Sequence, residues 1–374
     1  MATECAESLA GHLVGAECRS GGGERVNFDP KATPEQRHAA IHGLVKQLAS
    51  DTAPILIGPF RSELGFEASY WQPFLSWLSK QIKGFDQRAV VVTRGGLAPL
   101  YASVASRGVD LYAIRSVTEV RRENLYDQKH TGLLKQVKPT DWDTRALEDA
   151  ARALQLGPVF HTVHPAWMYW GLAPYWDEHA GARYLQAVTD YAPIAKPAAF
   201  PGSETLPPVF VAMKFYGRAT FPYPDADVEA FVGRCAAMIA AQVPVVLLSS
   251  SNEYDDHSDI PIQGPNIFSL APPAGQPGVP PHENLLLQAS VLSRAKAFVG
   301  TYGGMAQLAL RLGVPSVSLW KEFGGTSHAH LSLQSWISKA TKVPFTAGSI
   351  EDAALWQGIV SVPGPVSVAD EAYA

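Results

Sequence analysis

The sequence is most informative at Ala297-Phe298-Val299-Gly300-Thr301-Tyr302-Gly303-Gly304-Met305-Ala306-Gln307-Leu308-Ala309. Its first four residues are predicted to form a short buried strand, and a turn of small residues leads from that strand into a helix. The first turn of a helix has backbone N–H groups without intrahelical acceptors and lies at the positive end of the helix dipole. Gly303 and Gly304 would let a phosphate approach the backbone closely, and Thr301 would offer a hydroxyl. The stretch is therefore a candidate phosphate site, unless its glycines only relieve crowding in a tight connection.

Short apolar runs alternate with helical patterns on both sides of this stretch. Strands are predicted at 54–58, 89–93, 109–114, 159–163, 209–213, 244–248, 297–300 and 314–319. Helices are predicted from Thr33-Pro34-Glu35-Gln36 to about Ala49 and at 64–82, 116–137, 144–155, 225–242, 284–294 and 305–312. Pro73 should kink the helix at 64–82 near Ser69. This alternation predicts an α/β fold with parallel sheets that helices cover on both faces.

A proline-rich segment at 191–208 separates the two series and is the best linker candidate. We therefore expect a leader and helix at 1–50, an α/β domain at 51–195, a linker at 196–208, a second α/β domain at 209–361 and a tail at 362–374. The segment 252–281 is predicted to be a loop rich in proline and glycine.

The composition excludes several classes of protein. The chain has 374 residues, a net charge of −5 and no basic run, which argues against binding to duplex nucleic acid. Its three cysteines have spacings that fit neither a zinc site nor a disulfide framework. No stretch approaches the roughly 18 apolar residues of a membrane span, and the N-terminus lacks the pattern of a secretory signal. We expect a cytoplasmic protein.

The glycine spacing excludes other nucleotide-binding motifs. Gly300-x-x-Gly303-Gly304 is not the G-x-G-x-x-G of dinucleotide-binding folds, and no G-x-x-x-x-G-K-[ST] occurs. A nicotinamide dehydrogenase or a P-loop enzyme is therefore disfavoured.

The segment 283–290, the turn at 299–309 and the segment 312–316 resemble the donor half of GT-B glycosyltransferases. The similarity covers about 208–320 and is greatest to the heptosyltransferase-like branch and related polysaccharide glycosyltransferases. A second match, Gly58-Pro59-Phe60-Arg61-Ser62-Glu63-Leu64-Gly65-Phe66-Glu67 and the aromatic positions after it, resembles the first strand-to-helix turn of the same group. The resemblance implies two Rossmann-like α/β/α domains facing each other across a cleft, with the acceptor on the N-terminal domain and the nucleotide sugar on the C-terminal one.

Polar residues of the first domain follow predicted strands. Glu63 and Glu67 are four residues apart on one helix face, where either could be the general base for an acceptor hydroxyl or could simply favour the helix dipole. Arg61, Arg94 and His164 are expected to contact substrate, although Arg61 could instead pair with Glu63, and His164 could be a core or surface histidine.

In the second domain, Lys214 ends a predicted strand and could stabilise the departing diphosphate. The other residues expected to bind the donor follow neighbouring strands: Arg218, Ser249, Ser250, Thr301, Tyr302, Gly303, Gly304, Met305, Ala306 and Glu322.

No metal site is predicted. Strand alternation directs His161 and His164 to opposite faces, and the D-x-D strings at 141–143 and 225–227 precede predicted helices as caps. We thus expect a metal-independent glycosyltransferase that uses a nucleotide sugar as co-substrate and no other cofactor. A sugar-nucleotide 2-epimerase and a non-catalytic nucleotide- or sugar-binding module remain as alternatives.

Overall fold

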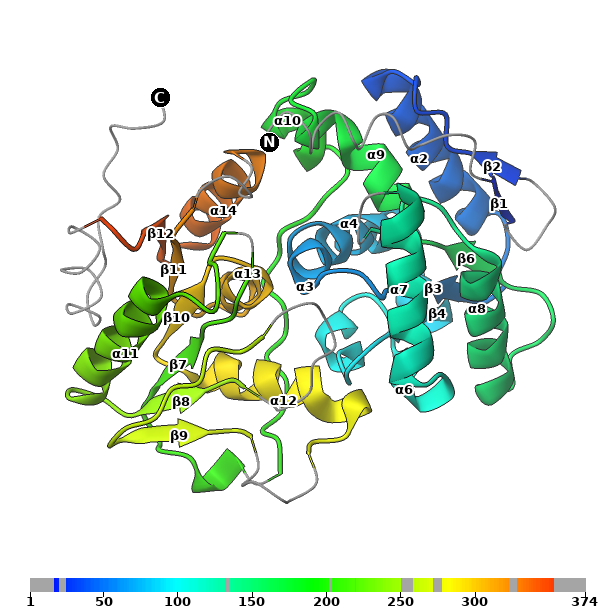
Figure 1. Cartoon of the computed structure of the whole chain (residues 1–374). Coiled ribbons are helices and arrows are strands. Elements are labelled where there is room, and N and C mark those ends of the chain that lie inside the picture. The colour runs from blue at the N-terminus through cyan, green and yellow to red at the C-terminus, as the bar shows by residue number, and fades with distance from the viewer. Residues whose placement is uncertain are drawn as a thin grey trace. The chain divides into compact units, whose positions relative to one another are not determined.

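The computed structural model describes residues 17–19, 25–131, 135–201, 203–218, 220–249, 258–271, 278–322 and 328–352. These residues form two compact units, each with its own parallel sheet (Figure 1). Unit 1 comprises the described residues up to Ala195 together with Pro280–Leu286, and unit 2 begins at Lys196 and takes the rest. The expected α/β class is confirmed by the two parallel sheets with helices between their strands.

Unit 1 has a four-stranded parallel sheet in the order β5-β4-β3-β6. Its strands are β3 (Ile55–Ile57), β4 (Ala89–Thr93), β5 (Arg107–Asp110) and β6 (His161–Val163). Its α-helices are α2 (Pro34–Ala49), α3 (Leu64–Phe66), α4 (Gln72–Gln81), α5 (Phe85–Arg88), α6 (Leu111–Ile114), α7 (Val117–Thr131), α8 (Asp141–Ala153), α9 (Ala166–Trp176) and α10 (Ala182–Gln186). A π-helical turn η1 (Glu67–Trp71), a 3-10 turn η2 (Ala98–Tyr101) and the antiparallel pair β1 (Glu17–Arg19) and β2 (Arg25–Asn27) complete its described elements.

Unit 2 has a six-stranded sheet in the order β12-β11-β10-β7-β8-β9, and every pair in it is parallel. Its strands are β7 (Val211–Lys214), β8 (Val245–Leu247), β9 (Ile267–Ser269), β10 (Ala297–Thr301), β11 (Ser316–Trp320) and β12 (Phe345–Ser349). Its helices are η3 (Ser203–Thr205), α11 (Ala226–Ala240), α13 (Gly304–Arg311) and α14 (His328–Thr341), and α12 (Pro281–Arg294) belongs to it from Leu287 onward. An apolar cluster between this sheet and α11 is fully buried around Met213, Cys235 and Leu319.

Several predicted elements differ from the structure. The strand predicted at 109–114 ends at Asp110, because the Asp110 carboxylate accepts the Tyr112 N–H and starts the short helix α6. The loop predicted at 252–281 contains the edge strand β9. The leader predicted at 1–30 contains the β1–β2 pair, while most of that leader and the whole tail at 362–374 lie outside the described residues.

The helix start predicted at Thr33 is confirmed in detail. The Thr33 side chain accepts the Gln36 N–H, the Gln36 side chain accepts the Thr33 N–H at 2.8 Å, and Pro34 is the first helical residue. No helix among the described residues is both long enough and apolar enough to cross a bilayer.

The helix predicted at 64–82 contains a π-helical turn just before Pro73. The chain makes a five-residue π-helical turn before it, in which the Gln72 N–H bonds the Glu67 carbonyl. Pro73 has no N–H to offer the Ser69 carbonyl, so the usual helical hydrogen bond to that carbonyl is absent. The Tyr191 hydroxyl donates to that carbonyl at 3.0 Å and replaces the missing bond.

Tyr191→Phe should therefore lower the free energy of unfolding by about 0.5–1.5 kcal/mol, because it removes the hydrogen bond to the Ser69 carbonyl. Denaturant unfolding measures this change. Tyr126→Phe is the matched control, since Tyr126 is exposed on α7 and should give no change. An equal effect of the two substitutions would contradict this role of Tyr191.

Candidate functional site

The sheet of unit 2 reverses its strand order beside β7. From β7 the chain proceeds through β8 to β9 on one side, and from β10 through β11 to β12 on the other. In open parallel sheets ligands bind beyond the carboxyl ends of the strands at such a reversal. Here those ends are Lys214 on β7 and Thr301 on β10, which adjoin in the sheet. The predicted phosphate turn thus lies at the switch point of unit 2.

The helix after this turn begins without a capping side chain. Gly303 is the N-cap residue of α13 and makes no side-chain cap hydrogen bond. Met305 and Ala306 follow in the first turn with buried side chains, so they can offer a ligand only backbone N–H groups. The start of α13 therefore has the chemistry of an anion site.

Two side chains of the loop after β7 lie against Gly303. A Cβ atom at Gly303 would lie 2.0 Å from the Tyr216 hydroxyl oxygen and 3.2 Å from Arg218 Nη1. The backbone there is extended, so the close approach of Tyr216, and not a special dihedral angle, requires glycine. Tyr216 received no role from the sequence. Tyr216 could have been recognised as a candidate site residue from its position two residues beyond the end of a predicted strand.

Arg218 provides a positive charge next to the turn. Its backbone pairs with that of Phe221 through two hydrogen bonds of 3.0 Å, which hold the loop in a tight hairpin. Arg218 is half-buried, and its Nε has no hydrogen-bond partner among the described residues. Within the described residues no carboxylate forms an ion pair with it. An uncapped helix start and an arginine without an ion-pair partner among the described residues therefore adjoin in one loop cluster.

Thr301 has a structural role in place of the expected ligand contact. Its side chain is fully buried, and its Oγ1 accepts the Tyr216 N–H at 3.1 Å and lies 3.3 Å from the Tyr216 carbonyl. The hydroxyl thereby joins the end of β10 to the loop after β7. Tyr302 is also buried, and its ring packs edge-on against Trp320 at 6.0 Å.

The other predicted donor residues surround the same sheet edge. Lys214 Nζ donates to Gln288 Oε1 at 2.9 Å and lies 3.7 Å from Asp259 Oδ1, and it remains half-buried. Ser249 is half-buried just beyond β8, whereas Ser250 lies outside the described residues. Glu322 is exposed two residues beyond β11, and its N–H donates to the Thr220 carbonyl.

Unit 1 repeats this topology. Its strand order reverses between β3 and β6, so the turn from Gly58 to Glu63 and the residue His164 follow the two carboxyl ends. The candidate acceptor residues of the sequence therefore do gather at a switch point. These residues differ in how deeply they are buried and in the groups that they bond.

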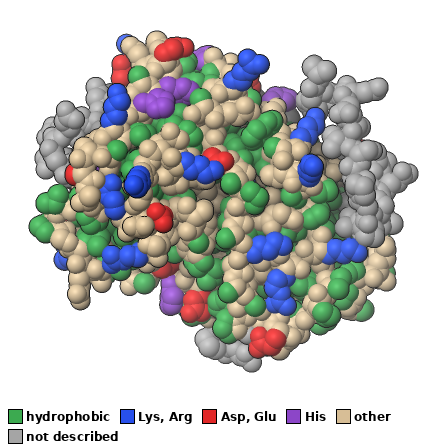
Figure 2. All heavy atoms as spheres, turned by 180° about the vertical axis from the view of Figure 1, so that it is seen from behind, with side chains coloured by type: hydrophobic (Ala, Val, Ile, Leu, Met, Phe, Trp, Pro, Cys, Tyr) green, Lys and Arg blue, Asp and Glu red, His purple; other side chains and the backbone are tan. Residues whose placement is uncertain are grey.

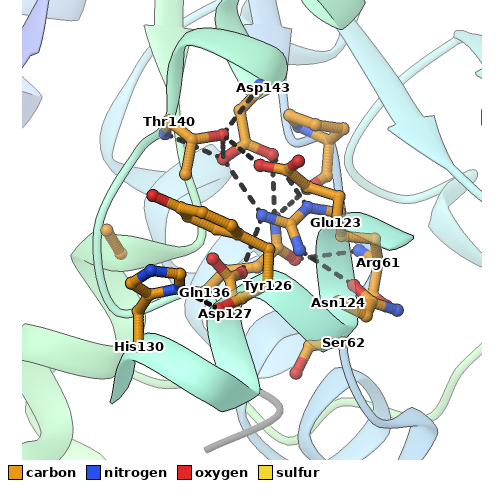
Figure 3. A network of polar contacts seen from close by, with 12 residues as sticks. Arg61, Ser62, Glu123, Asn124, Tyr126, Asp127, His130, Gln136, Thr140 and Asp143 are labelled. Carbon is orange, nitrogen blue, oxygen red and sulfur yellow. Dashed lines mark hydrogen bonds and ion pairs between the residues drawn. The ribbon is translucent and has the colours of Figure 1, made fainter. Parts of the chain in front are cut away.

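Arg61 lies at the centre of a buried network in unit 1 (Figure 3). Its guanidinium forms ion pairs with Asp127 at 2.8 Å and Asp143 at 3.0 Å, and donates to Asn124 Oδ1 at 2.8 Å. Its backbone N–H donates to Gln136 Oε1 at 2.8 Å. The expected substrate contact of Arg61 is therefore wrong, because the side chain is fully enclosed and already neutralised. Its alternative pairing with Glu63 is also not seen.

The two acids of this network have opposite pKa shifts. Burial would raise the pKa of Asp143, but the charge of Arg61 and the hydrogen bond from His164 outweigh it and hold that pKa well below its usual range. Burial raises the pKa of Asp127 to about 6, and the attraction of Arg61 only partly opposes this. The neighbouring Asp143 and Glu123 carboxylates add to the rise.

His164 is enclosed in the same network and not available to a substrate. Its Nδ1 accepts the Ala166 N–H at 3.0 Å, which leaves the proton on Nε2, 3.3 Å from Asp143 Oδ2. His161 instead bonds Asp51 at 2.9 Å, so the two imidazoles have separate partners, as strand alternation predicted. Asp143 also completes the capping box of α8 with Thr140, and Asp225 caps α11, which confirms that both D-x-D strings serve helix starts.

Glu67 and Glu63 occupy different environments in spite of their helical spacing. Glu67 is fully buried and accepts hydrogen bonds from Thr93 at 2.8 Å, Tyr101 at 2.6 Å and Arg94 at 2.8 Å. Arg94 donates in turn to the Ser62 carbonyl, so it fixes the backbone just before Glu63. Glu63 itself is partly exposed at the start of α3 and makes no capping hydrogen bond. Glu63 is thus the carboxylate that a substrate could reach.

The pKa of Asp127 gives a test of the buried network. A folded-state pKa near 6, above the usual value of an aspartate, means that the folded state binds the proton more tightly than the unfolded state. This contribution to stability is complete below about pH 4 and is lost as the pH rises through about 6.

The titration of Asp127 should therefore lower the unfolding free energy of the wild-type protein by about 1–3 kcal/mol between about pH 4 and 6. The Asp127→Asn variant should lack this contribution, so its unfolding free energy should fall less over the same range. Urea unfolding across this pH range measures both slopes. Glu148→Gln, at an exposed position of α8, should keep the wild-type slope. The same slope in Asp127→Asn and the wild type would rule out this titration.

Among known proteins, the chain is similar only to solved structures. No protein-family model and no curated protein matches the chain. Among solved structures, the chain is similar to a glycosyl transferase family 9 protein of Veillonella parvula, with 15% identity, a TM-score of 0.40, and 83% of this chain and 91% of that chain covered. It is also similar to the E. coli heptosyltransferase WaaC with ADP, with 13% identity, a TM-score of 0.36, and coverage of 82% and 98%.

A third similar structure is the iron-containing dodecameric glycosyltransferase TibC of enterotoxigenic E. coli, with 13% identity and a TM-score of 0.38. That match covers 72% of this chain and 59% of TibC, so the chain spans less than two thirds of that protein. Likeness at these TM-scores assigns no activity. A putative UDP-N-acetylglucosamine 2-epimerase from Listeria monocytogenes is also similar, with 11% identity and a TM-score of 0.31.

Proposed function

We propose that this protein is a glycosyltransferase that moves a sugar from a nucleotide-sugar donor to an acceptor hydroxyl. The observation that carries the proposal is the uncapped start of α13 at the switch point of unit 2, with Arg218 beside it, which pairs with no carboxylate of the described residues. A diphosphate offers several negatively charged oxygens, which match backbone N–H groups and a guanidinium together. A nucleotide sugar is a ligand of this kind whose diphosphate is also a leaving group.

In this proposal unit 2 stabilises the diphosphate as the bond to the anomeric carbon breaks. The first-turn amides of α13 and Arg218 bind its oxygens, and Lys214, half-buried at the end of β7, adds a second positive charge. The cations of the chain thus take the role that a divalent metal plays in other glycosyl transfers, and turnover should continue in the presence of EDTA.

Glu63 is proposed as the general base that takes the proton of the acceptor hydroxyl. Its carboxylate lies at the switch point of unit 1, is partly exposed and makes no capping hydrogen bond to the helix. Glu67 and Arg94 instead form a buried ion pair that positions the turn before Glu63. The acceptor oxygen then attacks the anomeric carbon, and the nucleoside diphosphate departs with the electron pair of the broken bond.

The first test is a thermal-shift panel of nucleoside diphosphates. A ligand that binds only the folded state raises Tm, and at a concentration about 100 times Kd it stabilises by about 2.7 kcal/mol. Arg218→Gln should weaken binding by about 10- to 100-fold, because one charge-assisted contact to the phosphates is lost. Arg234→Gln, at an exposed position of α11, is the control and should bind like the wild type. If no nucleoside diphosphate raises Tm, or if Arg218→Gln binds unchanged, the donor site is not here.

The second test separates chemistry from binding. Glu63→Gln should lower transfer by about 10²- to 10⁴-fold and keep the thermal shift with nucleotide, because only the proton acceptor is lost. Mass spectrometry of products from a nucleotide sugar and a panel of hydroxyl acceptors measures transfer, with Glu204→Gln as an exposed control.

Full activity in Glu63→Gln would remove Glu63 from the mechanism. Conversion of the nucleotide sugar to an isomer without any acceptor would identify a 2-epimerase instead. Binding without either reaction across the panel would favour a non-catalytic module.

A further inference from the structure

Helix α7 separates its charges between two faces. Its inward side holds the Arg61 network, since Asn124 bonds the Arg61 carbonyl at 3.0 Å and Asp127 pairs with the guanidinium. Glu123 Oε1 accepts the Thr140 hydroxyl at 3.0 Å (Figure 3). Two of the three acids of the helix are thus engaged with the body of unit 1. The third, Glu119, bonds Ser116 at the start of the helix.

The outward side of α7 is basic at both ends and apolar between them. Its exposed members recur every three or four residues, which places them on one helix face over three turns. We call this set the α7 face: Arg121, Arg122, Leu125, Tyr126, Lys129 and His130. Leu125 is 46% exposed and Tyr126 is 51% exposed, and they are neighbours among the few exposed large apolar side chains of the described residues.

This arrangement is unusual for a solvated helix. Exposed apolar residues elsewhere in the described chain occur singly, at Val159, Val209 and Phe268. Figure 2 shows the molecule from behind, with Lys and Arg side chains among hydrophobic, acidic and uncharged ones. On α7, by contrast, an apolar pair has two arginines one turn before it and a lysine one turn after it. The acid on this side of the helix is Glu119, which lies one turn before Arg122 and accepts the Ser116 hydroxyl.

We propose that the α7 face docks on a membrane surface that contains anionic lipids. Basic residues near such a surface are attracted to its negative potential, and Leu and Tyr partition into the boundary between headgroups and acyl chains. A soluble polyanion would satisfy the bases but would leave Leu125 in water, so the apolar pair favours the bilayer. The docking is peripheral, through one helix face, and is independent of whether unit 2 binds a nucleotide.

The test is co-sedimentation of the full chain with vesicles. The wild-type protein should bind vesicles of equimolar phosphatidylcholine and phosphatidylserine, bind much less to phosphatidylcholine alone, and dissociate as salt is added. The double variant Arg121→Glu and Arg122→Glu should bind at least about tenfold more weakly, because each base near the surface contributes a similar electrostatic attraction. Leu125→Ser with Tyr126→Ser should also weaken binding, although it changes no charge.

The matched control is Arg145→Glu with Arg234→Glu, which reverses two exposed arginines on α8 and α11 and should bind like the wild type. All substituted positions are exposed, so Tm should stay unchanged, and the nucleotide thermal shift reports on the proposed donor site separately. Absence of binding to the anionic vesicles would overturn the proposal. Equal loss of vesicle binding in the control variant would also overturn it. If Leu125→Ser with Tyr126→Ser had no effect on vesicle binding, the α7 face would be a site for soluble polyanions and not for a membrane.

Discussion

Both units depend on the same constraint, which is that a parallel sheet brings the carboxyl ends of all its strands to one edge. Where the strand order reverses, the following connections turn to opposite sides, and the strand ends between them stay open to a ligand. The reversal falls between β3 and β6 in unit 1 and between β7 and β10 in unit 2. Each polar residue with a plausible role in transfer follows one of these strands or a neighbour. The strand order therefore determines where a ligand can bind, and the residues of the turns determine which groups it meets there.

The two turns use this location differently. In unit 1, the turn before Glu63 is held by two buried arginines, Arg61 and Arg94, and both are neutralised by carboxylates of the chain. Buried ion pairs of this kind add little net stability, but breaking one is costly, so they define a single backbone geometry. In unit 2, the turn at Gly303 is short, and its helix starts without a side-chain cap. The turn of unit 1 thus fixes the position of the Glu63 side chain, whereas the turn of unit 2 leaves the first N–H groups of α13 without a side-chain acceptor.

Local patterns allowed most of the fold to be predicted, and long-range contacts account for the differences. The capping box at Thr33 and the strand at 89–93 depend on adjacent residues, and both are found as expected. The π-helical turn before Pro73 depends on Tyr191, which is more than 100 residues away in the chain. Likewise, Arg61 meets its partners Asn124 and Asp143 across separations of 63 and 82 residues. No spacing rule distinguishes such an arginine from one that binds a ligand. The strands whose ends lead into the turns at the two switch points were predicted from local apolar runs and needed no such contact.

Once the structure is known, the charges around an arginine show whether it is paired within the protein or available to a ligand. A buried charge without a partner costs several kcal/mol, so an enclosed arginine must find acids within the protein, as Arg61 does with Asp127 and Asp143. Arg218 is half-buried, its Nε has no acceptor, and no carboxylate of the described residues pairs with it. Its neighbour Gly303 begins a helix whose first N–H groups also lack a side-chain acceptor. Two adjacent groups that both require negative charge favour one anion that serves them together. A diphosphate has enough oxygens to do so, whereas a single carboxylate would satisfy only one of them.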